Sequence, residues 1–369
     1  MNELYYEKVK VLNEPTMESS YQKEDCIFLL KNVNAAVTEL STDVREQNMA
    51  QGVHYSEMLP QEYFPTAEYL EVFHDSLRTT AKEIAQYVAD VTELILKKRG
   101  KDVILVSLAR AGTPIGVLMS RYIQTKYGFI PPHYAVSIIR GKGIDENAMI
   151  YMINKHQSTN FQFIDGWTGK GMINDVLKKA VADFKDKYDI QLNAELAVLA
   201  DPSQATSIYG TRKDFLIPSA CLNSTVSGLV SRTFCREDVI GENDFHGAKY
   251  YSEWENEDVS NYFVEEVAKY FPMIHPNDLQ EGKVLNTGMA EVLAIRQKFG
   301  VNDINKIKPG VGETTRVLLR RVPWKILVDS LDNPDLKHIL LLAKDRNVPV
   351  EVYSEMNYSC IGLIKDVAE

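Results

Sequence analysis

The sequence predicts an α/β protein in which a parallel sheet is followed by a second, smaller α/β unit. Short apolar runs at residues 102–107, 133–139, 161–164 and 195–200 have the length of buried strands. Between them lie segments with apolar residues at helical spacing, such as residues 172–184. Glycine-containing turns connect strands to helices, and this alternation is typical of a parallel sheet covered by helices.

The turn after the strand at 161–164 has the composition of a phosphate-binding loop. Asp165 ends the strand, glycines follow that let the backbone approach a ligand, and a helix starts at once with its free N–H groups facing the turn. The spacing differs from the nucleotide-triphosphate loop, which needs four residues between its glycines. A structural turn is the alternative. The residues predicted to hold a ribose and its 5′-phosphate are Asp165, Gly166, Thr168, Gly169, Lys170 and Gly171.

A second turn of this kind follows the strand at 102–107. Pro114 stands where a helix begins, a position that proline favours. Arg110 therefore lies near a helix N-terminus at the carboxyl edge of the sheet, where parallel sheets bind ligands. Its planar guanidinium suits phosphate oxygens, although a solvated loop charge is the alternative. The predicted pyrophosphate site comprises Ser107, Ala109, Arg110, Ala111, Gly112 and Thr113.

A basic loop lies between the two turns. Arg140 and Lys142 alternate with glycines after the strand at 133–139, so the loop is predicted to be mobile and to close over a polyanion. Two phosphate-facing turns and a basic loop indicate a ligand with phosphates at two ends. Phosphoribosyl pyrophosphate (PRPP) is such a ligand.

These motifs resemble those of the type I phosphoribosyltransferases. More closely, residues 106–114, 137–145 and 165–171 are similar to phosphoribosyltransferase-like proteins of bacterial tellurite-resistance and stress operons, often labelled StiP. The resemblance implies a type I phosphoribosyltransferase-like core that binds PRPP with Mg²⁺, a metal held through PRPP and in part by Asp165. It also implies transfer to an unidentified base-like acceptor, which would give a nucleoside-like metabolite in a stress response. A non-catalytic phosphoribosyl sensor is the alternative.

The polar region at residues 201–251 is expected to cover the carboxyl edge of the sheet and to form the acceptor pocket. A second interpretation makes Cys221 the nucleophile of a cysteine protease, with His246 or His275 as its base, and the StiP label carries that claim. A cysteine among apolar neighbours is more often packed inertly. The predicted pocket residues are Asp201, Arg212, Cys221, Asn223 and Ser224.

The tail of the chain carries a basic motif of its own. From residue 281 onward 13 Lys and Arg stand against 12 Asp and Glu, whereas the whole chain has a net charge of −10. Residues 310–316 resemble the signature of the Pelota and ribosomal kink-turn-binding family, which implies a small α/β/α domain that binds structured RNA. A solvated helix face is the alternative. The residues expected to contact RNA are Gly310, Gly312, Glu313, Arg316, Arg320 and Arg321.

The chain is therefore predicted to have three parts: an N-terminal hood at residues 1–65, a core at 66–275 and an RNA-binding tail at 281–369. Its four cysteines lack CxxC spacing, which argues against disulfides and metal centres. A charged N-terminus without a long apolar run predicts no signal peptide and no membrane span, and so a cytoplasmic location. The sequence leaves open whether the chain forms a homodimer.

Overall fold

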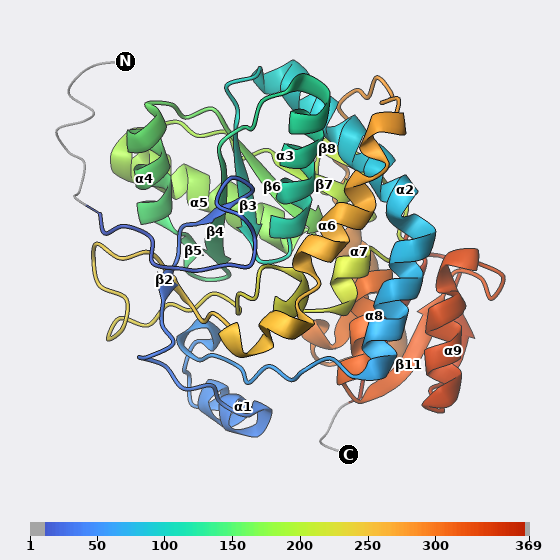
Figure 1. Cartoon of the computed structure of the whole chain (residues 1–369). Coiled ribbons are helices and arrows are strands. Elements are labelled where there is room, and N and C mark those ends of the chain that lie inside the picture. Colours follow the sequence, from blue (N-terminus) through green and yellow to red (C-terminus); the bar gives the residue numbers. More distant parts are fainter. Residues whose placement is uncertain (1–11, 366–369) are drawn as a thin grey trace.

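The computed structural model of the chain describes residues 12–365 and, at Arg320, the backbone alone. Its centre is a parallel sheet with the strand order β1-β4-β3-β6-β7-β8 (Figure 1), and β5 pairs antiparallel with β4. The strands are β1 (Ile27–Phe28), β3 (Ile104–Ala109), β4 (His133–Ile139), β5 (Gly143–Ile144), β6 (Phe161–Trp167), β7 (Leu196–Ala200) and β8 (Ile208–Thr211).

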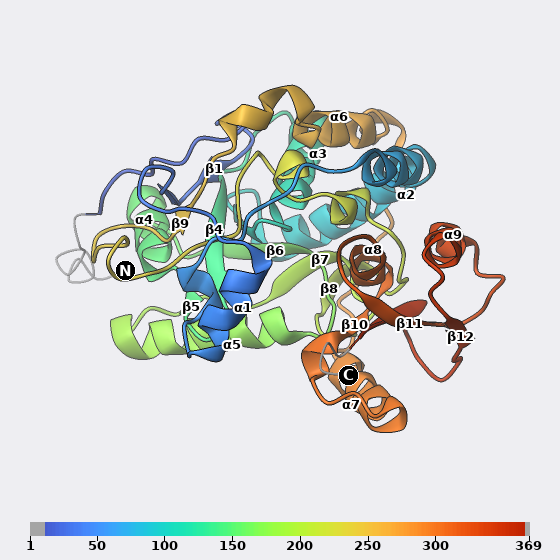
Figure 2. The ribbon, with the colours of Figure 1, turned by 90° about the horizontal axis from the view of Figure 1, so that it is seen from below.

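Helices cover both faces of this sheet (Figure 2). One face carries α2 (Ala67–Arg99), α3 (Thr113–Tyr127) and α6 (Ser260–Ala268), and the other carries α4 (Glu146–His156) and α5 (Met172–Tyr188). The central strands are thus buried on both sides, which explains why they appear in the sequence as continuous apolar runs.

The longest helix, α2, lies within the predicted core, but no sequence prediction above places a helix at these residues. Its 33 residues place Phe73, Leu77, Ile84, Val88 and Ile95 in the core. These positions recur at helical spacing, so the sequence did contain the signal for this helix.

The N-terminal segment crosses the carboxyl edge of the sheet before α2 begins. It contains β2 (Lys31–Asn32), α1 (Thr42–Ala50) and the 3-10 helix η2 (Tyr55–Glu57), and β2 pairs with β9 (Gly247–Ala248). The other 3-10 helices are η3 (Pro218–Cys221), η4 (Ser224–Val226), η5 (Ser252–Glu257), η6 (Phe271–Met273), η7 (Ile304–Lys306) and η8 (Pro334–Leu336).

A C-terminal unit with its own sheet begins at α7 (Thr287–Phe299) and lies beside α2 and β8 (Figures 1 and 2). The strand order of this sheet is β10-β13-β11-β12. Its remaining elements are β10 (Ile307–Pro309), α8 (Val311–Arg320), β11 (Pro323–Val328), α9 (Lys337–Asp345), β12 (Val350–Val352) and β13 (Cys360–Ile364).

The C-terminal unit shares a hydrophobic core with the rest of the chain. Val311 and Leu318 of α8 belong to the same buried cluster as residues of α2 and α3. Asp214 lies at the join, where its carboxylate accepts hydrogen bonds of 2.9 Å from the backbone N–H groups of Val311 and Ser359. Burial raises the pKa of Asp214 to about 7, although these hydrogen bonds act in the opposite direction.

The structure confirms a mixed α/β fold with a mostly parallel central sheet and a small C-terminal α/β unit. One local prediction is wrong, because β6 continues through Asp165 and Gly166 to Trp167 and the turn starts only at Thr168. The type I phosphoribosyltransferase fold, the homodimer, the cytoplasmic location and the division at 1–65, 66–275 and 281–369 stay predictions, and residues 1–11 and 366–369 of that division lie outside the described residues. Between residues 12 and 365, no helix is long and apolar enough to span a membrane.

Candidate active site

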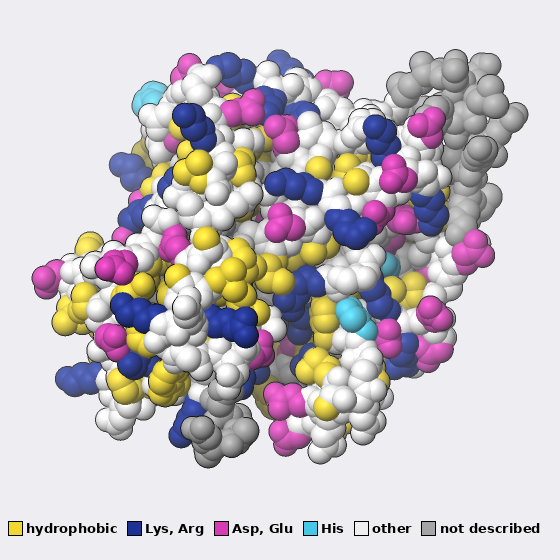
Figure 3. Space-filling model, turned by 180° about the vertical axis from the view of Figure 1, so that it is seen from behind, with side chains coloured by type: hydrophobic (Ala, Val, Ile, Leu, Met, Phe, Trp, Pro, Cys, Tyr) yellow, Lys and Arg dark blue, Asp and Glu magenta, His cyan; other side chains and the backbone are white. Residues whose placement is uncertain are grey.

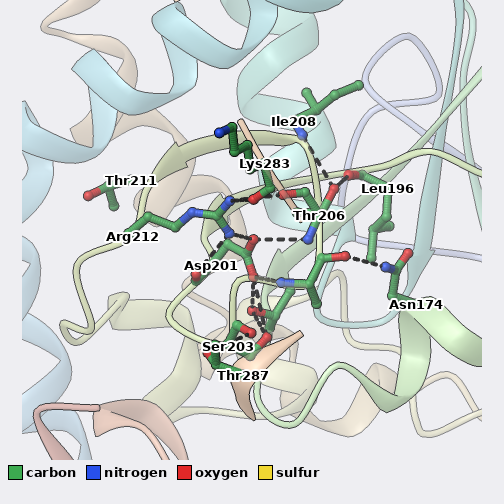
Figure 4. Close-up of polar contacts among 12 residues, drawn as sticks. Asn174, Leu196, Asp201, Ser203, Thr206, Ile208, Thr211, Arg212, Lys283 and Thr287 are labelled. Atoms are coloured by element: carbon green, nitrogen blue, oxygen red, sulfur yellow. Dashed lines mark hydrogen bonds and ion pairs between the residues drawn. The ribbon is translucent and has the colours of Figure 1, made fainter. Parts of the chain in front are cut away.

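The turn after β6 is closed on one side by Asp201, which is fully buried. Thr168 donates a hydrogen bond to Asp201 Oδ1 at 2.5 Å and accepts one from Ser203 at 2.7 Å. Arg212 forms an ion pair with the other carboxylate oxygen and donates to the carbonyl of Lys283 at 2.7 Å (Figure 4). The backbone N–H groups of Ala205 and Thr206 also donate hydrogen bonds to the Asp201 carboxylate. Asp201 and Arg212, both predicted for an acceptor pocket, are thus bound to each other inside the protein.

The C-terminal unit closes this turn from the other side. The hydroxyl of Tyr358 donates to the carbonyl of Gly169 at 2.7 Å, and Lys170 donates to the carbonyl of Ile304 at 2.5 Å. Gly171, which precedes α5, has a φ of +81°, a conformation that favours glycine. The polar groups of three residues predicted to hold a ribose phosphate, Thr168, Gly169 and Lys170, are therefore engaged by protein partners.

Asp165 and Gly166 lie just before that turn, at the end of β6. The Asp165 carboxylate accepts a hydrogen bond of 2.8 Å from the backbone N–H of Gly166. Burial raises the pKa of Asp165 to about 7, while the Gly166 N–H and the charge of Arg316 act in the opposite direction. This buried carboxyl is therefore more easily protonated than an aspartate in water.

The loop after β3 is also engaged by protein partners. Arg110 forms an ion pair with Glu62, whose side chain is buried, and donates to the carbonyl of Val230 at 3.0 Å. Ser107 lies in the core with its hydroxyl 2.7 Å from His133 Nε2. The rest of the predicted pyrophosphate site is buried or half-buried: Ala109, Ala111, Gly112 and Thr113.

Cys221 is not brought beside either histidine considered as its base. Its side chain is 0% exposed at the end of η3. His275 is exposed in the segment after η6, and His246 contacts a different cysteine. Asn223 and Ser224 follow Cys221, and the Ser224 N–H donates to Glu62 at 3.4 Å.

Cys235 is the cysteine that faces His246. Phe234 and Gly247 exchange two backbone hydrogen bonds, of 2.7 and 2.8 Å, across an antiparallel bridge. Cys235 and His246 are the neighbouring residues on the two sides of this bridge. In an antiparallel arrangement such a position is not backbone hydrogen-bonded, and its side chains lie close together. The two side chains lie close enough for each to shift the pKa of the other, and both residues are half-buried.

Groups from the end of β4 and the start of α4 orient His246. Its Nδ1 lies 2.8 Å from the hydroxyl of Ser137, and its backbone N–H donates to Asp145 Oδ2 at 2.6 Å. The other oxygen of Asp145 accepts from Ala148 and so caps the N-terminus of α4. The position of the imidazole is therefore fixed by ordered elements of the core.

The charges around the pair shift both pKa values toward an ionic form. Burial alone would raise the pKa of the Cys235 thiol, but the hydrogen bond to His246 and the charges of His246 and Lys142 lower it below its usual value. Burial alone would lower the pKa of His246, but Asp145 and Cys235 raise it. A thiolate beside an imidazolium is the form that attacks carbonyl carbon.

The basic loop predicted to close over a polyanion contacts this pair. Lys142 donates to the carbonyl of Cys235 at 2.8 Å and pairs with Glu57 at 2.9 Å. The backbone N–H of Arg140 donates to the hydroxyl of Tyr55 at 2.9 Å. The loop is thus tied to η2 of the N-terminal segment.

Sequence reasoning considered His246 but did not consider Cys235. The two residues stand on either side of a polar turn, in which Asp244 donates from its backbone to the carbonyl of Gly241 at 3.1 Å. A Gly- and Asn-containing turn between two short runs is a hairpin signal. That signal indicates a hairpin here, but the register that brings Cys235 opposite His246 comes from the Phe234–Gly247 bridge.

Of the residues predicted to contact RNA, Gly310 and Gly312 are buried, and Glu313 and Arg316 are half-buried. Arg316 donates to the carbonyl of Ala220 at 2.9 Å and is paired with Glu313. A Cβ on Gly312 would lie 3.1 Å from the Ala220 Cβ, and one on Gly310 would lie 3.2 Å from the Asp214 carboxylate. The last two stand at the far end of α8: Arg320, whose side chain is outside the described part, and the exposed Arg321.

Comparison with known proteins identifies both parts of the chain. Residues 19–268 match the family model described as tellurite-like stress resistance cysteine protease StiP, and residues 286–366 match the PELOTA RNA binding domain. The chain is 32% identical over 367 residues to the Cysteine protease StiP of Acinetobacter baylyi, in an alignment that covers 95% of this chain and 94% of that protein. The resemblances to the StiP and Pelota families are thus confirmed.

The same comparisons correct the predicted function. The prediction of a PRPP- and Mg²⁺-dependent phosphoribosyltransferase is wrong, because the matching family and the relative are both described as a cysteine protease. The roles given to individual residues in PRPP binding lose their basis with it, and Mg²⁺ stays an untested prediction. In the part of the chain that the structure describes, no group of three or more His, Cys, Asp or Glu could hold a metal ion. The chain belongs to the StiP family of tellurite-like stress resistance proteins and ends in a Pelota-like domain.

Proposed function

We propose that this chain is a thiol hydrolase that cleaves peptide bonds, with Cys235 as its nucleophile and His246 as its base. The observation that carries the proposal is that Cys235 and His246 lie beside the Phe234–Gly247 bridge, with the thiol pKa lowered and the imidazole pKa raised. The description of the A. baylyi relative as a cysteine protease supports the peptide bond as the substrate class.

The reaction follows from the chemistry of this pair. The Cys235 thiolate attacks the carbonyl carbon, a C–S bond forms, and the proton held by His246 passes to the leaving amine as the C–N bond breaks. His246 then takes a proton from water, whose oxygen attacks the thioester, so that the acid product leaves and the thiolate is restored. Ser137 and Asp145 act as positioning residues, because their side chains hydrogen-bond His246 and hold the imidazole in place.

The buried cysteines provide the contrast that singles out Cys235. Cys26 and Cys360 are fully buried, and burial raises the pKa of both thiols. Cys221 is also fully buried. Cys235 is half-buried, so a substrate carbonyl can reach it, and its thiol pKa is shifted downward.

RNA binding by the C-terminal unit is a second proposed function. The match of residues 286–366 to the PELOTA RNA binding domain supports it. This function is independent of the thiol chemistry, and either can fail without the other.

The test of the hydrolase compares two cysteine variants of the full chain. Iodoacetamide at pH 7 followed by peptide mapping should label Cys235 first and leave Cys221 unlabelled. Cleavage of a panel of fluorogenic peptides should fall at least about 1,000-fold in Cys235→Ala. The matched control Cys221→Ala should retain cleavage, provided its melting temperature shows that it is folded.

Two results would overturn this assignment. Slow labelling of Cys235, at the rate of an ordinary exposed thiol, would show that the pair is not ionic. Peptide cleavage that survives in Cys235→Ala would place the nucleophile elsewhere.

A further inference from the structure

Six cations from six separate segments gather between the carboxyl edge of the sheet, α1 and the C-terminal unit. In residues 12–365 none of the six forms an ion pair with a carboxylate. Seen from behind, the surface is hollowed between two lower lobes, with Lys and Arg side chains at the inner end of the hollow and acidic ones at its lower end (Figure 3). The six are Arg45, Arg140, Lys170, Arg232, Lys308 and Arg321.

Direct contacts bring several of these cations together. The guanidinium groups of Arg140 and Arg232 lie 5.5 and 5.3 Å from the centre of the same ring, that of Tyr55. Lys170 reaches from the core to the carbonyl of Ile304, which lies in η7 directly before β10 and its Lys308. One contact therefore joins the hood to the core, and the other joins the core to the C-terminal unit.

The charges act on one another over the whole group. Burial and then the neighbouring Arg321 lower the pKa of Arg45. Burial, together with Lys308 and Arg140, lowers the pKa of Lys170 to about 8, although Asp303 and Glu313 act against this shift. Burial and three arginines, among them Arg45 and Arg140, lower the pKa of Arg232 to about 10.

Arg45 adds an independent observation. Its Nε is buried and has no hydrogen-bond partner among the described residues. A buried donor of this kind is unfavourable unless it is paired, and like charges held together repel one another. An anion placed among the six cations would satisfy the donor and relieve the repulsion.

The C-terminal unit contributes Lys308 and Arg321 to this cluster, and both lie outside the motif at residues 310–316. Gly310 and Gly312 are buried, and the guanidinium of Arg316 is engaged by the Ala220 carbonyl and by Glu313. Lys308 and Arg321 flank the same helix, α8, and are half-buried and exposed, respectively. An RNA strand that reaches the C-terminal unit would therefore pass over these two residues.

We propose that the six cations form a composite site for the phosphodiester backbone of RNA, shared by the core and the Pelota-like unit. The proposal rests on the RNA binding proposed above and adds where the strand runs. A phosphodiester backbone fits because its charges are spread over several nucleotides, as the six cations are spread over six segments. The strand would pass Arg140, two residues before the Lys142 that holds the carbonyl of Cys235.

The test uses the full chain and a fluorescein-labelled RNA hairpin with a single-stranded 3′ extension, in anisotropy titrations from 50 to 300 mM salt. The variant R140Q/K308Q removes two cations from two different parts of the cluster. The control K101Q/K155Q removes two exposed cations that lie at the opposite edge of the sheet, next to the starts of β3 and β6. Both pairs change the net charge by the same amount.

The expected result is a loss of about 10-fold in affinity at low salt for R140Q/K308Q. The slope of log affinity against log salt should fall by about 1.4, which corresponds to two phosphate contacts on single-stranded RNA. The control should show neither change. Inorganic pyrophosphate, measured by calorimetry, should bind at least 100-fold more weakly than the hairpin.

Three results would overturn the proposal, and they are distinguishable. RNA binding that is equal in both double variants would place the RNA elsewhere and leave RNA binding itself standing. The absence of any RNA binding at 50 mM salt would remove both this site and the RNA-binding function. Tight pyrophosphate binding that only R140Q/K308Q abolishes, with RNA binding unchanged, would show a small phosphate ligand in place of RNA.

Discussion

The carboxyl edge of the central sheet carries two polar networks that differ in how completely the protein satisfies them. Asp201 is fully buried, and its oxygens are taken by Thr168, Arg212 and two backbone N–H groups. The Cys235–His246 pair is half-buried, and its pKa values are shifted toward an ionic form. A closed network of this kind stabilises the fold, whereas an open and shifted one is available for chemistry.

The largest expected difference between the two networks is in stability. Asp201→Ala should lower the free energy of unfolding by about 3 to 5 kcal/mol, because it leaves the Arg212 charge and several N–H groups without an acceptor. Urea titration followed by circular dichroism measures this change. Cys235→Ala is the comparison and should change the same free energy by about 1 kcal/mol or less. Equal losses of unfolding free energy in the two variants would mean that the Asp201 network stabilises the fold no more than the Cys235–His246 pair does.

His246→Ala should change the reactivity of Cys235, whereas Asp201→Ala is expected to change the stability of the fold. The substitution removes the interaction with His246 that lowers the pKa of Cys235. The burial of Cys235, which raises this pKa, remains. The rate of iodoacetamide labelling of Cys235 at pH 7 should fall by about 10- to 100-fold, which corresponds to a charged hydrogen bond of about 1.5 to 3 kcal/mol. His275→Ala, at an exposed position, is the matched control and should leave the rate unchanged.

The rate of Cys235 labelling should also depend on pH, because only the thiolate reacts. Since the thiol pKa is lowered, the midpoint of the wild-type rate should lie below the usual thiol pKa of about 8.5, and the rate should fall as pH decreases through that midpoint. In His246→Ala the midpoint should move upward. A wild-type midpoint at or above about 8.5 would mean that the pair carries no ionic character.

Asp145→Asn should have a smaller effect, because it removes a charge that acts on His246 through space. The amide oxygen can still accept the backbone N–H of His246, so the bridge should stay in place. Loss of the carboxylate should lower the pKa of His246, which Asp145 raises. Titration of the imidazole by NMR checks the direction. An unchanged or higher pKa would show that Asp145 has no electrostatic role.

The smallest effect is expected for Lys142→Gln. The Lys142 ammonium helps to lower the thiol pKa, but its side chain is 26% exposed and also pairs with Glu57. Labelling of Cys235 at pH 7 should slow by about 5-fold or less, and the difference from wild type should shrink in high salt. A persistent effect in 1 M salt would point to a structural role for Lys142.

The sequence predicted the parallel sheet well, because strands covered by helices on both faces need continuous apolar runs, as at residues 133–139. It did not predict the site, because a glycine-rich turn has the same composition whether it binds phosphate or closes on protein. Thr168 could be assigned only once the fold brought Asp201 and Ser203 to it. His246 was recognised as a candidate base, but its partner depended on a bridge between Phe234 and Gly247.

The burial of Asp214 between the core and the Pelota-like unit has a consequence for how this protein can be divided. In a core cut off from the C-terminal unit, the Asp214 carboxylate would lose the hydrogen bonds from the Val311 and Ser359 N–H groups. In the separated C-terminal unit, the apolar side of α8 with Val311 and Leu318 would be exposed to solvent. Exposed apolar patches of this kind promote aggregation. Fusing the C-terminal unit to another protein would therefore require a new surface that covers α8. The core and the C-terminal unit should accordingly be kept together in one polypeptide.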